Sequence, residues 1–177
     1  ITNGKMMGDG GGVLNRGGGL VLENCVIAGN SGNLFGGGVA LDYEQSTVIK
    51  NCTIANNSVG GFGGGLSVRG LGYVTIENCT ISDNTGGGLF FEHVGFNTSL
   101  SNCTISGNYA PQSGSAVLNQ DEGNNESAVL LSSCTIVNNR TGNGGGVITT
   151  LTRALGDRAD IELENTLVAA NQGKNFV

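Results

Sequence analysis

Short segments in which apolar and polar residues alternate recur along the whole chain. One set of these segments follows runs of glycine: VALD, LSVR and LFFE. A second set directly precedes an asparagine or a serine: TVIK, VTIE and VLLS. Successive side chains of a strand point to opposite faces of a sheet, so a period of two predicts β-strands. We find no long run with a helical period of 3.6 residues, and we therefore expect an all-β chain.

These segments belong to a repeat that is marked by cysteine and by glycine. The five cysteines are separated by 27, 27, 24 and 31 residues, most of them in the string NCTI, and triple glycines recur with a similar period. A period in the twenties is typical of a solenoid. Three short strands per period, each pairing with its copy one turn further on, predict a right-handed, single-stranded parallel β-helix of about six turns. We expect a single domain over residues 1–177, in a processed chain or a segment of a longer one.

Alternation also predicts which residues stack inward to form a continuous core. In the second strand of each turn the inward residues are Leu22, Ile49, Ile76, Leu100, Leu131 and Leu163. In the third strand they are the cysteines followed by Ile27, Ile54, Ile81, Ile105, Ile136 and Val168. In the first strand they are Val13, Val39, Leu66, Leu89, Val117 and Val147.

An asparagine before the third strand marks a predicted corner in most turns. Asparagine tolerates left-handed dihedrals, and stacked asparagines can hydrogen-bond from turn to turn, so we expect a buried ladder there. The ladder comprises Asn24, Asn51, Asn78, Asn102 and Asn165, with Ser133 interrupting it. If these asparagines are buried, the NCT sequons are structural, and Asn125 is the accessible glycosylation acceptor.

The cysteine column is expected to consist of buried free thiols that act as small apolar residues. In-register neighbours lie about 4.8 Å apart with parallel Cβ vectors, beyond the usual Cβ separation of a disulfide. The column comprises Cys25, Cys52, Cys79, Cys103 and Cys134. A partly disulfide-linked column and a metal site remain open as alternatives, although His93 is the single histidine. We predict no cofactor and no metal, and the sequence leaves calcium binding by the loops undecided.

Charge narrows the range of partners. The formal net charge is −6, 12% of the residues are charged, and no basic stripe exists to neutralise phosphates, which argues against nucleic acid. No apolar run approaches the roughly 20 residues of a membrane-spanning helix. Outward columns of alternating sign, such as Arg16, Asp42, Arg69 and Glu92, agree with the proposed stacking.

A second outward column on the first strand is more apolar than a solvated face should be. Contiguous exposed apolar surface usually marks a binding site, so this column is a candidate interaction face. It comprises Leu14, Ala40, Ser67, Phe90, Leu118 and Ile148. The alternative is that a long loop, FFEHVGFN or LTRALGDRAD, folds over it.

The combination of GGG[VL], NCTI and a closing asparagine resembles bacterial right-handed parallel β-helix repeat proteins. It is also similar to the repeats of chlamydial polymorphic outer-membrane proteins, with isoleucine in place of the phenylalanine of their FxxN signal. The resemblance implies export, an extracellular, cell-surface or outer-membrane-associated location, and adhesive or structural roles, often within a much longer chain.

Three functions follow from these observations. The first is a non-catalytic structural or adhesive surface module, capped by self-association into a fibre or sheath or by neighbouring domains, with a surface glycan or a host protein as further partner. The second is a polysaccharide hydrolase or lyase that uses Asp42 and Glu92, about 9.6 Å apart by rung spacing, with Arg69 between them and His93 adjacent. The third is ice or surface binding through Thr53, Thr80, Thr104 and Thr135.

Overall fold

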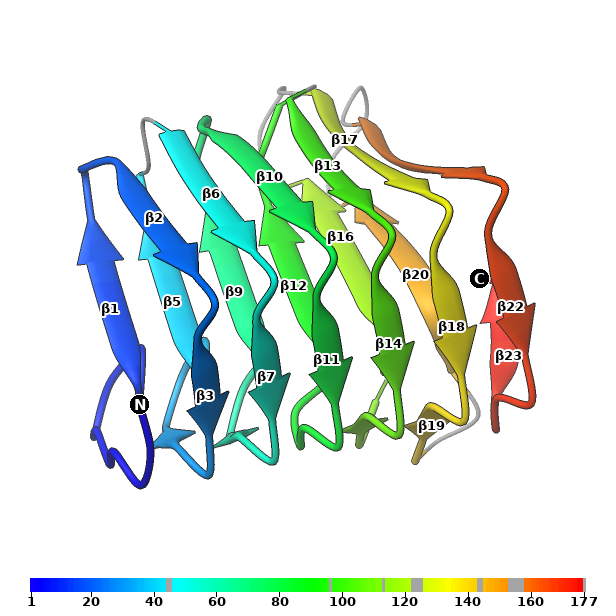
Figure 1. Cartoon of the computed structure of the whole chain (residues 1–177). Helices are drawn as coiled ribbons and strands as arrows, with labels where there is room; N and C mark the ends of the chain where they lie inside the picture. Colours follow the sequence, from blue (N-terminus) through cyan, green and yellow to red (C-terminus); the bar gives the residue numbers. More distant parts are fainter. Residues whose placement is uncertain are drawn as a thin grey trace.

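Six stacked rungs, each built from three short strands, make up the described part of the chain (Figure 1). The structure is a computed structural model and describes residues 1–43, 46–95, 97–112, 114–121, 126–142, 145–152 and 158–176. Every strand pair within these residues is parallel, and no helix occurs among them. The prediction of an all-β parallel β-helix is confirmed.

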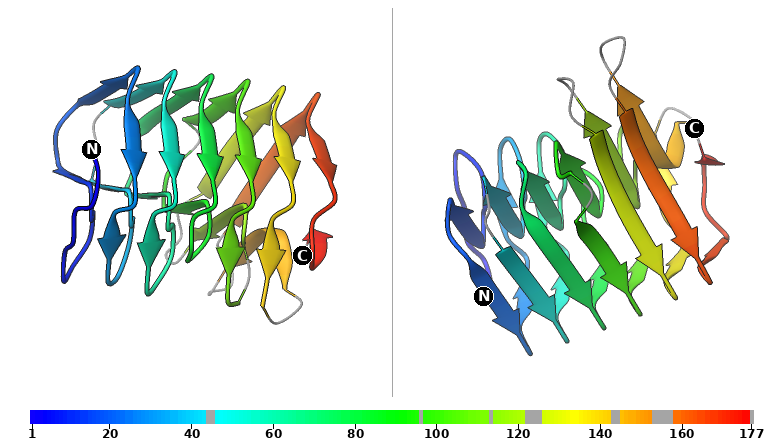
Figure 2. Two further views of the ribbon diagram at one scale, coloured as in Figure 1. Left: turned by 60° about the horizontal axis from the view of Figure 1, so that its bottom comes forward. Right: turned by 90° about the horizontal axis from the view of Figure 1, so that it is seen from above.

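Three long sheets run along the axis of the β-helix, and each rung contributes one strand to each sheet (Figure 2). The first sheet contains β1 (Val13–Arg16), β5 (Val39–Asp42), β9 (Leu66–Arg69), β12 (Leu89–Glu92), β16 (Val117–Asp121), β20 (Gly146–Thr152) and β23 (Lys174–Phe176). The second contains β2 (Leu20–Glu23), β6 (Ser46–Lys50), β10 (Tyr73–Glu77), β13 (Thr98–Ser101), β17 (Glu126–Ser132) and β21 (Arg158–Glu164). The third contains β3 (Val26–Ala28), β7 (Thr53–Ala55), β11 (Thr80–Ser82), β14 (Thr104–Ser106), β18 (Thr135–Val137) and β22 (Leu167–Ala169).

A fourth side, which the sequence did not predict, lies between the third sheet and the first. It consists of the two-residue strands β4 (Ser31–Gly32), β8 (Ser58–Val59), β15 (Tyr109–Ala110) and β19 (Arg140–Thr141). Isolated bridges continue the row from Lys5 through Thr85 to Gln172. Each rung is therefore tied to its neighbours on four sides.

The observed register confirms the predicted inward columns, with one exception in the sixth rung. Leu22 pairs with Ile49 in the second sheet, and Ile27 pairs with Ile54 in the third, as alternation predicts. In the first sheet Val117 pairs with Ile148 rather than with Val147. The prediction for the sixth rung was therefore wrong by one residue, which turns Ile148 inward and places Thr149 beside Leu118. Both Val147 and Ile148 are buried in the core.

The asparagines at the predicted corner have the predicted backbone conformation but not the predicted role. Their φ angles lie between 46° and 54°, and Ser133 has a φ of 55° at the same corner. Their side chains are exposed, however, and the described residues form no hydrogen-bond ladder there. The prediction of a buried ladder through Asn24, Asn51, Asn78, Asn102 and Asn165 was wrong, and so was the burial of the NCT asparagines. Asn125 lies outside the described residues.

The buried ladder instead uses the asparagine that closes each repeat. The amide nitrogen of Asn57 donates to Oδ1 of Asn84 at 3.1 Å, and that of Asn84 donates to Oδ1 of Asn108 at 2.9 Å. Each Oδ1 also accepts the main-chain N–H of the preceding asparagine, as for Asn57 N at 2.9 Å from Asn84 Oδ1. The ladder runs through Asn30, Asn57, Asn84, Asn108, Asn139 and Asn171. It links all six rungs through side-chain amides, as stacked asparagines do in other parallel β-structures.

The cysteines form a column of free thiols, as predicted. Four are buried and Cys25, in the first rung, is half-buried. Each thiol donates to the carbonyl two residues earlier, as for Cys52 Sγ and the Lys50 oxygen at 3.1 Å. In the sixth rung the hydroxyl of Thr166 makes the equivalent contact to the Glu164 carbonyl at 2.8 Å, which explains how threonine replaces cysteine. Burial raises the pKa of Cys52, and the adjacent Cys134 and Cys79 thiols, with burial, raise the pKa of Cys103.

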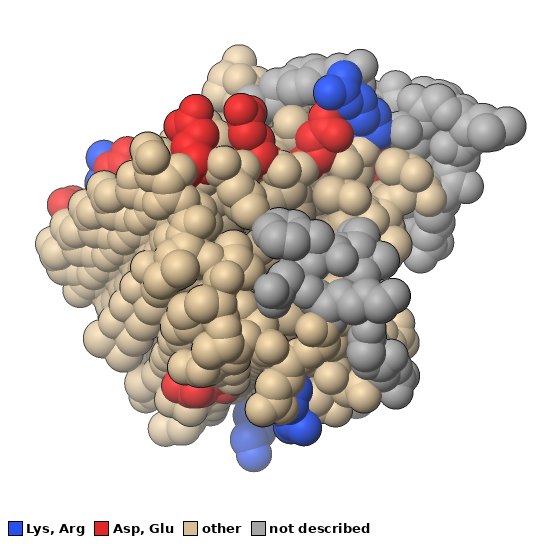
Figure 3. All heavy atoms as spheres, turned by 90° about the vertical axis from the view of Figure 1, so that its right-hand side faces the viewer, with Lys and Arg blue, Asp and Glu red and all other residues tan. Residues whose placement is uncertain are grey.

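The two ends of the described β-helix expose parts of the core. Val13 and Leu20 in the first rung, and Ile161, Leu163 and Val168 in the sixth, are only partly buried against it. The C-terminal end, which faces the viewer in Figure 3, also carries a row of acidic side chains, and β21 supplies Asp160, Glu162 and Glu164 at alternating positions.

Candidate functional site on the outer face of the first sheet

Glycine-rich loops cover the outer face of the first sheet. The segments 33–38 and 60–65, which precede β5 and β9, bring Phe35 and Phe62 over this face, where the two residues form a parallel bridge. Both rings stack with Phe90 of β12, at centroid distances of 5.5 Å for Phe35 and 5.2 Å for Phe62. We call these segments the covering loops.

The candidate interaction face therefore lies beneath the loops rather than at the surface. Ala40, Ser67, Phe90 and Leu118 are each at most 2% exposed, and only Leu14 of the first rung, at 36%, remains accessible. Ile148 is not part of this face because it points inward. The prediction of an exposed apolar face was wrong, and a loop does cover it, although the covering phenylalanines come from segments other than those expected.

Close contact between the covering loops and the sheet explains the first glycine of each triple. Gly36 has a φ of 62°, and a Cβ atom there would lie 2.2 Å from the main-chain oxygen of Val39. Gly63 has a φ of 70°, and its Cβ would lie 3.0 Å from Cβ of Phe90. A side chain at either position would be strained and would push the loop off the sheet.

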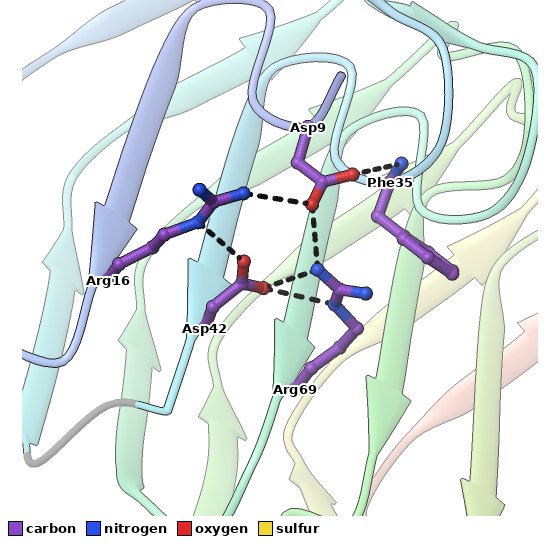
Figure 4. Close-up of polar contacts among 5 residues, drawn as sticks. All are labelled: Asp9, Arg16, Phe35, Asp42 and Arg69. Atoms are coloured by element: carbon purple, nitrogen blue, oxygen red, sulfur yellow. Dashed lines mark hydrogen bonds and ion pairs between the residues drawn. The ribbon is translucent and has the colours of Figure 1, made fainter.

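An ion-pair cluster lies at the edge of the covered face (Figure 4). Arg69 donates to Asp42 Oδ1 from Nη2 at 2.7 Å and from Nε at 3.0 Å, and its Nη2 also contacts Asp9 Oδ2 at 2.8 Å. Arg16 lies 3.3 Å from the second oxygen of Asp42 and 3.6 Å from Asp9. Asp9 also accepts the main-chain N–H of Phe35 at 3.2 Å. Two carboxylates and two guanidinium groups thus neutralise one another and tie three rungs to a covering loop.

Asp42, one of the two candidate catalytic carboxylates, belongs to this cluster. It is 3% exposed, and both its oxygens are engaged by arginine. The register places Asp42 and Glu92 two strands apart with Arg69 between them, as the sequence indicated. A buried carboxylate that is held by two arginines is poorly placed to exchange a proton with a substrate or to attack one.

His93 makes a contact that sequence reasoning did not identify. Its Nδ1 lies 2.8 Å from Oδ1 of Asp121, a fully buried carboxylate that also accepts the main-chain N–H of Arg158 at 3.3 Å. His93 occupies the corner after β12 with a φ of 56° and follows Glu92, whose side chain lies beside Gln120. The two residues meet because His93 directly follows β12 and Asp121 ends β16, the corresponding strand of the next rung. The rung alignment was therefore the signal that could have paired them.

The threonine column of the third sheet has the predicted register and lies on an outer face. Thr53, Thr80, Thr104 and Thr135 pair in succession, and the next outward column contains Ala55, Ser82, Ser106 and Val137. None of these eight side chains is charged.

Within the described residues, no group of three or more His, Cys, Asp or Glu side chains gathers that could hold a metal ion. Over the same residues, no helix has the length and apolar character needed to cross a membrane.

Comparison with known protein families assigns the chain to a family. The family model described as right-handed beta helix region matches residues 1–168, so the chain belongs to this family of right-handed β-helices. Searches of curated proteins and of solved structures found no match. The family contains both enzymes and proteins without catalytic activity, so membership alone does not decide between them.

Proposed function

We propose that this chain is a non-catalytic structural or adhesive β-helix module that acts outside the cell or at its surface. The observation that carries the proposal is the state of the first sheet's outer face. The covering loops bury this face, and the carboxylate that a hydrolase would need is neutralised within the Asp9–Arg16–Asp42–Arg69 cluster. These features stabilise a rod, and they bury the outward column from Ala40 to Leu118.

End-to-end association is part of this proposal. The first and sixth rungs leave inward residues partly exposed, and β2 and β21 each have a strand neighbour on one side only within the described chain. Unpaired strand edges with apolar surface favour pairing with another strand. A second copy or further rungs of a longer chain would meet this need.

Electron microscopy of the purified chain tests association directly. Rods longer than one copy, growing with protein concentration, are the expected result. Val21→Glu serves as the interfering variant. Val21 is an exposed outward residue of the terminal strand β2, and an added rung would pair with the free edge of this strand. Its matched control is Val48→Glu on the adjacent strand β6, which already has a neighbour on both sides. Single, unassociated particles at every concentration would reject the fibre-forming part.

One observation favours the alternative, a polysaccharide hydrolase or lyase. A histidine oriented by a buried carboxylate is a common arrangement for a general base, and His93 and Asp121 have this geometry. Incubation with a panel of polysaccharides, followed by assays for reducing ends and for unsaturated products, separates the two functions. We expect no product. Product formation that is lost in both His93→Gln and Asp42→Asn, but kept in the surface control Glu77→Gln, would establish catalysis instead.

A further inference from the structure

The loop that precedes the first-sheet strand is shorter in the fourth rung than in the rungs beside it, as the spacing of residues in the sequence shows. Leu66 follows the closing Asn57 by nine positions and Val117 follows Asn108 by nine, whereas Leu89 follows Asn84 by only five. The fourth rung therefore lacks most of a covering loop. Phe90, on the outer face of β12, takes the space that a loop side chain fills elsewhere, because it stacks directly on Phe62.

A cavity of about 180 Å³ opens where the loop is missing. Its walls are the loop of the third rung, through Gly60, Gly61 and Phe62, and the loop of the fifth rung, through Ala110, Pro111 and Gln112. Gly86 of the shortened loop lies between them. We call this cavity the notch.

The lining of the notch selects a class of ligand. Its described residues include an aromatic residue, a proline and the amide side chain of Gln112, and none of them is charged. Within the described chain, the main-chain N–H groups of Gly60 and Gly61 have no hydrogen-bond acceptor. Pockets that combine apolar walls with a few polar groups are typical of small-molecule sites. A cavity of about 150 Å³ in another protein accommodates benzene, so the notch is large enough for one six-membered ring.

We propose that the notch binds a single neutral pyranose ring. The C–H groups of the ring pack against Phe62 and Pro111, while Gln112 and the glycine main chain hydrogen-bond to its hydroxyl groups. A charged sugar is disfavoured because none of the described lining residues carries a charge that would compensate it. The proposal extends the adhesive part of the proposed function to a defined site, and a sugar bound there anchors one rung of the rod to a glycan.

Chemical-shift titration of the ¹⁵N-labelled chain with methyl glucoside and methyl galactoside tests the site. We expect saturable shifts at Gly60, Gly61, Gly86 and Ala110 with a millimolar dissociation constant, as suits a ligand of about a dozen non-hydrogen atoms. Glucuronate should bind more weakly. Shifts spread over unrelated rungs, no shift with either glycoside, or equal binding of cyclohexanol would each overturn the assignment.

Two variants and a matched control separate binding from folding. Phe62→Leu keeps an apolar side chain but removes the ring, and we expect the affinity to fall about fivefold. Gln112→Ala, at an exposed position, should weaken binding by about as much. Phe35→Leu is the control, because Phe35 has the same place in the loop of the second rung but does not line the notch. Equal losses in Phe35→Leu and Phe62→Leu would contradict the site. The titration is independent of fibre formation, so either result can fail without the other.

Discussion

Replacing Asn84 with alanine removes one residue from the middle of the buried asparagine ladder. Its Oδ1 accepts both the main-chain N–H of Asn57 at 2.9 Å and the Asn57 amide at 3.1 Å. Its own amide donates to Asn108 at 2.9 Å and to the carbonyl of Ile54 at 3.0 Å. Asn84 is fully buried, so water cannot replace these partners without entering the core.

The expected loss of stability follows from the donors left behind. Two hydrogens of Asn57, one on the main chain and one on the side chain, lose their acceptor in a buried setting. Each such group costs about 1–3 kcal/mol, so we expect Asn84→Ala to lower the free energy of unfolding by about 4 kcal/mol. Asn108 and Ile54 lose a donor, but the Asn108 Oδ1 still accepts the main-chain N–H of residue 84 at 3.0 Å.

Urea denaturation followed by circular dichroism measures this loss. The matched control is Asn78→Gly in the same rung, where the asparagine is exposed with a φ of 54° that glycine also adopts. We expect that variant to change the free energy by less than about 0.5 kcal/mol. If the two variants unfold at the same urea concentration, the ladder does not stabilise the rod and the reasoning about buried amides is refuted.

Three further predictions concern the covered face and the thiols. Ser67→Ala should unfold at the same or a higher temperature, because the buried Ser67 hydroxyl has no partner among the described residues; a large loss of stability would reveal a partner. Arg69→Met should cost about 3 kcal/mol in chemical denaturation, because it leaves the buried Asp42 carboxylate with Arg16 alone. The control Arg16→Met, whose side chain is 63% exposed, should cost about 1 kcal/mol or less. In the folded protein one thiol, that of the half-buried Cys25, should react rapidly with a disulfide reagent, since the other four thiols are buried and the reagent cannot reach them; rapid reaction of more than one thiol, or a fast phase that survives Cys25→Ser, would contradict this.

The architecture was predictable because the same alternation of apolar and polar residues recurs in each of the six rungs. Alternation assigns the faces of each strand, and the spacing of the cysteines sets which residues pair, so Ile54 had to stack on Ile27 once Cys52 stacked on Cys25. The rule failed in the sixth rung, where the triple-glycine marker suggested Val147. The observed pairing of Val117 with Ile148 keeps a β-branched residue in the column, so residue type alone could not reveal a shift of one position.

The two asparagine columns show why residue type did not assign the ladder. Asparagine suits both a left-handed corner and a stacked amide ladder, and both columns recur once per rung. Asn78 turns its side chain to solvent, whereas Asn84, six positions later in the same rung, turns inward against Gly65, the third glycine of the triple that opens its own repeat. That glycine was the available signal. A Cβ at Gly65 would lie 2.9 Å from the Asn84 amide nitrogen, so an invariant small residue beside an asparagine indicates close packing around it.

Departures from the period, rather than the period itself, locate the features that distinguish this chain from a uniform rod. Phe35 and Phe62 are 27 residues apart, the same interval that separates the first three cysteines, so their stacking over the sheet could have been read from the sequence. Phe90 breaks that interval because the fourth repeat is short, and it enters the stack from the strand instead of from a loop. A missing loop leaves space, and a rigid sheet beneath it keeps that space open. The 24-residue spacing between Cys79 and Cys103 therefore indicates where the notch lies, whereas the 27-residue spacings indicate the regular stacking of the rungs.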